Sequence, residues 1–345
     1  MSHNHICLST STKSIQKFIK TVTVIGGGKI GSGIAQLAAQ NAQNVLLVEI
    51  NEESIRKSFD RIVDSLSHTA RSIYKYNDVN VKKYIENTIS YLKGTTNTKT
   101  AIEKADLVIE AIPENFEKKV KLFRSLNVSA SSQTIFATTT DSLSVTAIAE
   151  KSLRKERLLG LHFFHPVVST KLVEVVKNPF TSQEIMESVI DWCKSIGKTT
   201  IICNDSPGFI VNRLIITYVT EAIRLMEKTG VSRKDIDTAM RSIMGQDLGP
   251  IQLADHLGHD TILNLVEAWR YKEPENMIFQ PCLSQKRLVE KGKLGMKSGE
   301  GFYKYNDLNY WIRTFAHLYK NKKDWSKHYQ IWRRTINKNK IKKVN

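Results

Sequence analysis

The chain has 345 residues, of which 41% are hydrophobic and 25% charged, and its formal net charge is +17. This length predicts two domains of ordinary size with room for an apolar core. No run approaches the ~18 apolar residues that span a bilayer, which indicates a soluble globular protein. The body is only mildly basic and shows no zinc-finger, RNA-binding or basic-zipper pattern, so nucleic acid is not expected as a partner.

The two ends carry much of the positive charge. Residues 1–20 contain no acid and are rich in Ser, Thr and Lys, which is typical of a mitochondrial presequence, although Arg is missing; a disordered extension is the alternative. Residues 306–345 contain eleven Lys and Arg against two Asp. This basic tail, of unassigned structure, fits either solvated disorder or a helix in weak contact with an anionic surface. The four cysteines show no paired spacing, which favours a reducing compartment.

Strand and helix patterns alternate from Thr21 onward. Helical spacing appears at 30–42 and 52–75, between short apolar runs that predict strands: TVTVIG, NVLLVEI, ADLVIEAI, QTIFATT, LLGLHFF and KLVEVV. This succession predicts an α/β fold, a Rossmann-type doubly wound sheet over residues 21–205. Helix-like segments then follow at about 208–229, 233–243, 249–269 and 283–292, which predicts an all-α C-terminal domain over 206–305.

A glycine motif, Gly26-x-Gly28-x-x-Gly31, comes directly after the first strand and opens a helix. Gly26 permits a tight turn, Gly28 lets a pyrophosphate approach the backbone, and Gly31 allows close packing of helix and strand. The second strand ends in Glu49, whose carboxylate can accept from both ribose hydroxyls and would repel a 2′-phosphate. The motif in this context predicts an NAD site.

Two further candidates for cofactor binding follow the strand ADLVIEAI. Glu114 and Lys119 lie where the carboxyl ends of parallel strands present ligand-binding residues. The structural alternative for Glu114 is an acid in the first turn of the next helix, where the helix dipole favours it.

The segment GLHFFHPVVSTKLVE, residues 160–174, joins two strand-like runs. If these pair antiparallel about Val168, His162 faces Glu174, with Cβ atoms ~4.5–5.5 Å apart. A carboxylate on one imidazole nitrogen makes the other a better base. Spacing alone leaves two interpretations open, a catalytic pair or a core histidine with a solvent-facing acid.

The segment ADHLGHD offers Asp255, His256, His259 and Asp260 as conceivable metal ligands. It lies in a helical stretch without compact ligand spacing, so no metal is expected.

The segments VTVIGGGKIGSGIAQ, GLHFFHPVVSTKLVEVV, NDSPGFIVNRL and GMKSGEGFYKY occur in the order seen in 3-hydroxyacyl-CoA dehydrogenases. The chain resembles this family over about residues 21–305, most of all the short, single-function mitochondrial type of fatty-acid β-oxidation. The resemblance implies an acyl-CoA substrate, NAD as cofactor and a homodimer formed through the helical domain. It also implies the mitochondrial matrix as location, with the cytoplasm as alternative.

The resemblance also implies roles for individual residues. His162 would remove the proton of the substrate 3-hydroxyl, and Glu174 would orient His162. Asn212 matches an asparagine that supports the substrate carbonyl. Ser65 matches a CoA contact on the long helix after the second strand, whereas the usual downstream lysine is missing and Arg71 is the proposed substitute.

Two positions depart from the family pattern. Asp141 stands where the family has a serine that hydrogen-bonds the reacting oxygen; an Asp can still accept from the alcohol, and it adds negative charge near Glu174. His165 replaces an asparagine. The leading interpretation is an active dehydrogenase. These two departures motivate a second interpretation, a catalytically weak paralogue retained for binding. A dehydrogenase of a small hydroxy acid is the third.

Overall fold

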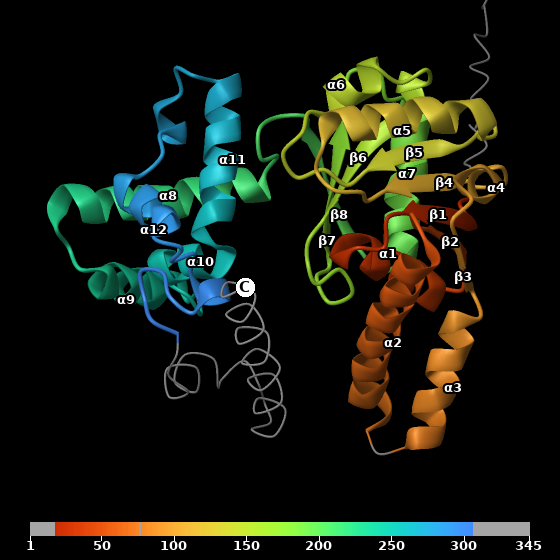
Figure 1. Ribbon diagram of the computed structural model, residues 1–345, viewed down its shortest axis with the longest axis horizontal. Coiled ribbons are helices and arrows are strands. Elements are labelled where there is room, and N and C mark those ends of the chain that lie inside the picture. The colour runs from red at the N-terminus through yellow and green to blue at the C-terminus, as the bar shows by residue number, and fades with distance from the viewer. Residues whose placement is uncertain (1–17, 76, 306–345) are drawn as a thin grey trace, which may run out of the picture. The chain divides into compact units, whose positions relative to one another are not determined.

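The computed structural model of the chain describes residues 18–75 and 77–305. It consists of two compact units that divide between Phe209 and Ile210 (Figure 1). The predicted presequence, apart from residues 18–20, and the basic tail lie outside the described residues. None of the described helices is long and apolar enough to cross a membrane.

An eight-stranded sheet forms the centre of the first unit. Its strands are β1 (Thr21–Ile25), β2 (Asn44–Val48), β3 (Leu92–Thr95), β4 (Leu107–Glu110), β5 (Ile135–Thr138), β6 (Leu158–Phe163), β7 (Leu172–Lys177) and β8 (Thr199–Asn204), in the spatial order β3-β2-β1-β4-β5-β6-β7-β8. Neighbouring strands run parallel except β6 and β7, which are antiparallel. The central strands β4, β5 and β6 are buried along their whole length, which explains their continuous apolar runs.

Helices cover both faces of this sheet (Figure 1). The first unit contains α1 (Lys29–Gln40), α2 (Glu52–Tyr74), α3 (Asp78–Ile89), α4 (Thr98–Ile102), α5 (Phe116–Ser129), α6 (Val145–Glu150), η1 (Lys155–Arg157) and α7 (Gln183–Ser195). Side chains of α1, α2 and α7 pack on one face, and those of α4, α5 and α6 on the other. The predicted doubly wound sheet is confirmed.

The six predicted strands are all present, but β3 and β8 were not predicted. They are the two edge strands of the sheet. Half of β3 is exposed, and β8 has only one buried residue, Cys203, among exposed and half-buried positions. An edge strand is covered less than a central one, so it needs fewer apolar residues and leaves a weaker pattern in the sequence.

The second unit is mainly helical in its described part, with two isolated β-bridges at Gly295–Glu300 and Glu300–Lys304. It contains α8 (Val211–Thr229), α9 (Arg233–Met244), α10 (Pro250–Leu257), α11 (His259–Lys272), η2 (Met277–Phe279), α12 (Leu283–Glu290) and η3 (Met296–Ser298). Its core is built around Trp269, Phe279 and Ile223. The prediction of an all-α second part is confirmed.

The single helix predicted over 249–269 is wrong, because two helices meet at Gly258. This glycine adopts φ 96° and ψ 127°, which ends α10 and begins α11. Its N–H still donates to the Ala254 carbonyl. The positive φ angle is what requires glycine here, because side chains with a Cβ rarely adopt it.

A buried carboxylate joins α10 to the end of the described chain. Asp255 accepts from the backbone N–H groups of Phe302 (2.9 Å) and Tyr303 (2.8 Å) and from the Tyr305 hydroxyl (2.6 Å). Its Oδ1 lies 2.6 Å from His259 Nε2, across the break between α10 and α11. Asp255 and His259 thus pair with each other, and the described residues contain no cluster of three or more ligands placed for a metal ion.

Replacing Asp255 by Ala is expected to lower the free energy of unfolding by about 3–5 kcal/mol, because buried donors and a buried histidine lose their acceptor. Urea unfolding followed by circular dichroism measures the change. The matched variant Glu267→Gln removes an exposed acid of α11, 4.0 Å from Lys286, and is expected to cost less than about 0.5 kcal/mol. Equal costs would show that the Asp255 network does not stabilise the unit.

Candidate active site

The glycine turn lies at the carboxyl end of β1, in the middle of the sheet. Gly26 has φ 97°, and a Cβ there would lie 2.6 Å from the Ala111 carbonyl oxygen. A Cβ on Gly31 would lie 1.8 Å from the Gly26 carbonyl, so turn and helix approach too closely for any side chain. Nothing lies within 4 Å of a Cβ built on Gly28, which leaves that side of the turn open to a ligand.

Glu49 is fixed against this turn directly after β2. Its Oε1 accepts from the Gly27 N–H at 2.7 Å and from Ser58 Oγ at 3.2 Å. From α2, Ser58 Oγ and Arg61 Nη1 also donate to the Gly27 carbonyl, at 3.0 and 2.7 Å. Ser58 and Arg61 were not predicted, because no glycine or strand-end pattern indicates them.

The donor set of this turn fits a dinucleotide. Helix α1 begins after Gly28 without any side-chain cap, so its first N–H groups are available to an anion. The Glu49 carboxylate provides acceptors for ribose hydroxyls one strand away.

A buried ion pair lies beneath the next strand end. Lys119 and Glu110 have no exposed side-chain surface, and Lys119 Nζ is 2.6 Å from Glu110 Oε1. Glu110 also accepts from Thr138 Oγ1 at 2.6 Å and from the Ile112 N–H at 2.8 Å. Lys119 Nζ also lies 3.5 Å from Glu114 Oε2, so the buried ammonium pairs with a second carboxylate, which is partly exposed. Glu110 was not predicted, because a carboxylate inside an apolar run resembles any strand-end acid.

Glu114 holds the loop that follows β5. It precedes Asn115, the N-cap of α5, so it lies outside the first helical turn. Its Oε1 accepts from the hydroxyl of Thr140, from Ser142 Oγ at 2.9 Å and from the Leu143 N–H at 3.2 Å. Burial alone would raise the pKa of Glu114, but the bond from Thr140 and the charge of Lys119 bring it below its ordinary value.

Asp141 lies in that loop between Thr140 and Ser142. Burial and the facing carboxylate of Glu114 raise the pKa of Asp141, while the charge of His162 acts in the opposite direction. The sequence predicted that Asp141 adds negative charge near Glu174; the carboxylate that raises the pKa of Asp141 is that of Glu114. A carboxyl that retains its proton more readily can donate a hydrogen bond as well as accept one.

The β6–β7 ladder brings His162 opposite Glu174, in the predicted antiparallel register. His162 Nδ1 lies 2.6 Å from Glu174 Oε2, with Glu174 fully buried and His162 6% exposed. The rings of Phe164 and Phe209 lie 4.4 and 5.5 Å from the imidazole. Because the carboxylate accepts from Nδ1, Nε2 is left as the basic nitrogen.

The remaining predicted residues are distributed over other elements. Ser65 lines a cavity of about 290 Å³ in the first unit, whose other lining residues include Arg61 and His165. Arg71 is exposed in the last turn of α2 and is not among the residues that line this cavity. Asn212 lies in the first turn of α8 in the second unit, and its predicted role stays a prediction.

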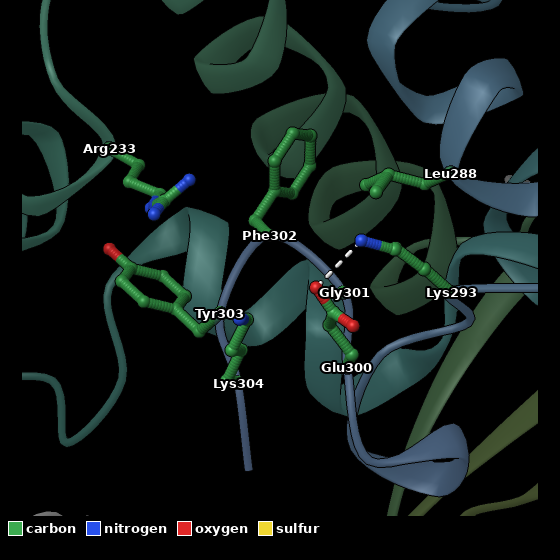
Figure 2. A pocket seen from close by; sticks show the side chains of 8 residues that line it. All are labelled: Arg233, Leu288, Lys293, Glu300, Gly301, Phe302, Tyr303 and Lys304. Carbon is green, nitrogen blue, oxygen red and sulfur yellow. Dashed lines mark hydrogen bonds and ion pairs between the residues drawn. The ribbon is translucent and has the colours of Figure 1, made fainter. Parts of the chain in front are cut away.

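A separate cavity of about 480 Å³ lies in the second unit (Figure 2). Lys293 and Glu300 form an ion pair of 2.7 Å at its wall, and the guanidinium carbon of Arg233 lies 5.2 Å from the centre of the Tyr303 ring. None of the predicted site residues lines it.

Comparison with known proteins yields two family matches. The 3-hydroxyacyl-CoA dehydrogenase NAD-binding domain matches residues 21–206, and the C-terminal domain of the same family matches residues 208–305. The mitochondrial hydroxyacyl-coenzyme A dehydrogenase of Rattus norvegicus is 47% identical over 287 residues, 83% of this chain and 91% of that protein. The Homo sapiens enzyme is 45% identical over 298 residues, 86% and 95% of the two chains. The solved (S)-3-hydroxybutyryl-CoA dehydrogenase of Ralstonia eutropha has a TM-score of 0.78 at 32% identity, covering 84% of this chain and 100% of that one.

Removing the Asp141 carboxyl is expected to raise the free energy of unfolding, relative to the wild type, as the pH rises. Its raised pKa means that the proton binds more tightly in the folded state. This contribution is complete below the ordinary value of 3.8 and is lost as the pH rises through the raised pKa. Urea unfolding at several pH values should show Asp141→Ser gaining on the wild type as the pH rises above about 4. Asp141→Asn keeps the shape and should show the same trend; a constant difference would contradict it.

Proposed function

The chain belongs to the 3-hydroxyacyl-CoA dehydrogenase family, and we propose that His162 and Glu174 carry its reaction. The chain is an NAD-dependent 3-hydroxyacyl-CoA dehydrogenase, an activity consistent with fatty-acid β-oxidation. The single observation that supports the proposed roles is the 2.6 Å contact between a buried carboxylate and His162 Nδ1.

His162 Nε2 accepts the proton of the substrate 3-hydroxyl as the C–O bond becomes a carbonyl. Glu174 holds the ring by Nδ1 and stabilises the imidazolium that forms, as a carboxylate does beside a catalytic histidine. Bound NAD would supply the hydride acceptor for C3 of the (S)-3-hydroxyacyl-CoA, so that the products would be the 3-ketoacyl-CoA, NADH and one proton. The aromatic rings of Phe164 and Phe209 shield the imidazole from water.

In this proposal, the cofactor is held by the glycine turn and by two carboxylates beside it, Glu49 and Glu114. The open face of Gly28 and the uncapped start of α1 accommodate the pyrophosphate, and Glu49 accepts from the ribose hydroxyls. Glu114, with Lys119 behind it, lines the edge of the sheet beside this turn.

Asp141 belongs to the proposed substrate site. Asp141 interacts electrostatically with His162 and can hydrogen-bond the reacting oxygen. Asn212, in the first turn of α8, is proposed to support the substrate carbonyl, the role that the resemblance to the family implies. Ser65 is the proposed contact to CoA on α2.

A catalytically weak paralogue is the second candidate, and Asp141 is the observation that favours it. A carboxylate pair at Asp141 and Glu114 opposes the negative charge that develops on an enolate-like substrate. Reduction of acetoacetyl-CoA by NADH discriminates between the two candidates. Robust turnover rejects the second one, whereas turnover that appears only in Asp141→Ser supports it.

The proposed location is the mitochondrial matrix, and the proposed assembly is a homodimer. The location rests on relatives named as mitochondrial enzymes at 45–47% identity.

The dimer rests on the second unit, where large apolar side chains such as Ile243 (85%) and Tyr271 (90%) are exposed.

Replacing His162 by Ala is expected to lower the rate of acetoacetyl-CoA reduction about 10²- to 10⁴-fold, because general acid–base catalysis typically contributes a rate enhancement of this size. The affinity for NADH, measured by fluorescence titration, should not change, since His162 does not contact the glycine turn in the proposed site. Glu174→Gln should lower kcat in the same direction but less. Unchanged turnover in His162→Ala would contradict the proposed role.

The matched control for Glu174 is the exposed Glu187 of α7. Glu187→Gln removes the same charge from the same unit and is expected to leave kcat and KM unchanged. A loss of similar size in both variants would assign the effect of Glu174→Gln to folding rather than to His162.

Sedimentation equilibrium is expected to show a dimer for the wild type. Introducing charge in the double variant Ile243→Glu/Tyr271→Glu should move the equilibrium toward the monomer, because a carboxylate is costly to bury in an interface. The control Val128→Glu places the same charge at an exposed apolar site of the first unit (81% exposed) and should leave the dimer intact. A monomeric wild type would contradict the proposed assembly.

A further inference from the structure

The cavity of about 480 Å³ in the second unit contains none of the residues proposed for catalysis, for NAD or for the substrate (Figure 2). Its lining comes from the start of α9, from α12 and from the stretch between Lys293 and Lys304. The charged residues of this lining are three cations, Arg233, Lys293 and Lys304, and one carboxylate, Glu300. Three cations against one carboxylate give the lining an excess positive charge, which favours an anion as ligand.

The carboxylate of Glu300 already compensates one of these cations. Lys293 Nζ donates to Glu300 Oε1 at 2.7 Å, the contact drawn as a dashed line in Figure 2. This bond, together with the charges of Lys293 and Lys304, holds the pKa of Glu300 below its ordinary value, so Glu300 is ionised at neutral pH. Lys293 and Glu300 therefore form a closed pair, and the excess charge is that of Arg233 and Lys304.

Arg233 faces an aromatic ring instead of an acid. Among residues 18–75 and 77–305 it forms no ion pair, and its guanidinium carbon lies 5.2 Å from the centre of the Tyr303 ring. Figure 2 shows this guanidinium beside the ring, across the cavity from Lys293. A cation–π contact positions a guanidinium without using its N–H donors, so the planar fork is left for the oxygens of a ligand.

The ring of Tyr303 is fixed by two buried carboxylates. Its hydroxyl donates to Asp237 Oδ2 at 2.7 Å, and its backbone N–H donates to Asp255 Oδ2 at 2.8 Å. Asp255 Oδ1 accepts from the N–H of Phe302 at 2.9 Å. This segment is thus held in one position by contacts outside the cavity, which lowers the cost of ordering it when a ligand binds.

Apolar surface accompanies the charges. Leu288 of α12 and Phe302 line the cavity, and both side chains are half-buried. The Phe302 ring packs edge-on against His259, with ring centres 5.0 Å apart, so its orientation is also fixed. An inorganic ion would leave this apolar surface in water, whereas a ligand with an apolar part covers it.

Charge also decides between possible occupants. The two ends of the chain are cationic, since residues 306–345 contain eleven Lys and Arg against two Asp, and residues 1–17 contain no acid. Neither end gains from a lining of the same sign. Two uncompensated cations match a dianion, and a phosphate monoester carries about −1.5 to −2 at neutral pH. A monocarboxylate would compensate only one of them.

We propose that this cavity binds a small organic phosphate monoester, with its phosphate on Arg233 and Lys304 and its apolar part against Leu288 and Phe302. The volume of about 480 Å³ falls within the ~300–1,000 Å³ of small-molecule sites. The cavity shares no lining residue with the sites proposed for NAD and for the substrate. The inference therefore does not depend on the proposed function.

Phenyl phosphate is the probe, because it joins a dianion to one apolar ring. Isothermal titration calorimetry on the full chain, with NADH and CoA at saturation to occupy the other proposed sites, is expected to show binding. Arg233→Gln should weaken this binding about tenfold, since a charge-assisted bond to phosphate is lost. Lys304→Gln should weaken it by about three- to tenfold. A wild type that does not bind phenyl phosphate would overturn the inference.

Lys234→Gln is the matched control, because Lys234 follows Arg233 on α9, is exposed and does not line the cavity. Its affinity for phenyl phosphate should equal that of the wild type. All three variants should unfold at the same urea concentration as the wild type, since each replaces an exposed side chain. An equal loss of affinity in Lys234→Gln would make the binding a general effect of surface charge and contradict the site.

Two further ligands test the chemical class. Inorganic phosphate lacks the ring and phenylacetate lacks the second charge, so each should bind about tenfold more weakly than phenyl phosphate. Equal binding of inorganic phosphate would show a simple anion site, and equal binding of phenylacetate would show a carboxylate site; either result overturns the inference.

Competition separates this cavity from the other sites and from a protein partner. The affinity for phenyl phosphate should be the same with and without NADH and CoA. A loss of binding when CoA is added would assign the cavity to the substrate and overturn the inference. So would a hexaglutamate peptide that binds through Arg233 more tightly than phenyl phosphate, because the cavity would then recognise an acidic segment of a protein.

Discussion

The antiparallel register between β6 and β7 is the constraint on which the site depends. Side chains alternate between the two faces of a sheet, so a slip of one residue would turn Glu174 to the opposite face from His162. The pair would then be lost, and a buried carboxylate would remain without a partner. The apolar residues on either side of the pair, Leu161, Phe163, Val173 and Val175, pack on the face covered by α1 and α7 and thereby fix the register.

The parallel part of the sheet positions the glycine turn and the carboxylates beside it. The carboxyl ends of β1, β2 and β4 present, in turn, the glycine turn, Glu49 and Glu114 at one edge. Each is held by bonds from a neighbouring element: Ser58 and Arg61 on the turn, the loop after β5 on Glu114. The buried pair of Lys119 and Glu110 lies behind this edge, where its desolvation cost is offset by four bonds to Glu110 and Glu114. Fixed polar groups of this kind need little reorganisation when a charged ligand arrives.

The sequence was sufficient for the parts of this architecture that rest on local patterns. Central strands, the glycine motif and the register of the His162 hairpin follow from periodicity and pairing rules. The edge strand β3 and the break at Gly258 did not, because the first is only half-buried and the second depends on a backbone angle within a continuous helical pattern. The partners of Asp141 and Lys119 were also out of reach, since Glu114 and Glu110 meet them only through the folded sheet.

Arg61 is a different case, because the sequence contained enough to find it. The lysine of related enzymes lies downstream of Ser65, which is why Arg71 was predicted as its substitute. Helical phase alone places Arg61 on the face of Ser65 and Arg71 off it. The structure adds what phase cannot give: the bond to the Gly27 carbonyl fixes Arg61 between the glycine turn and the cavity. One guanidinium thus connects the glycine turn with the cavity that Ser65 lines, a link between two elements that periodicity along α2 alone does not reveal.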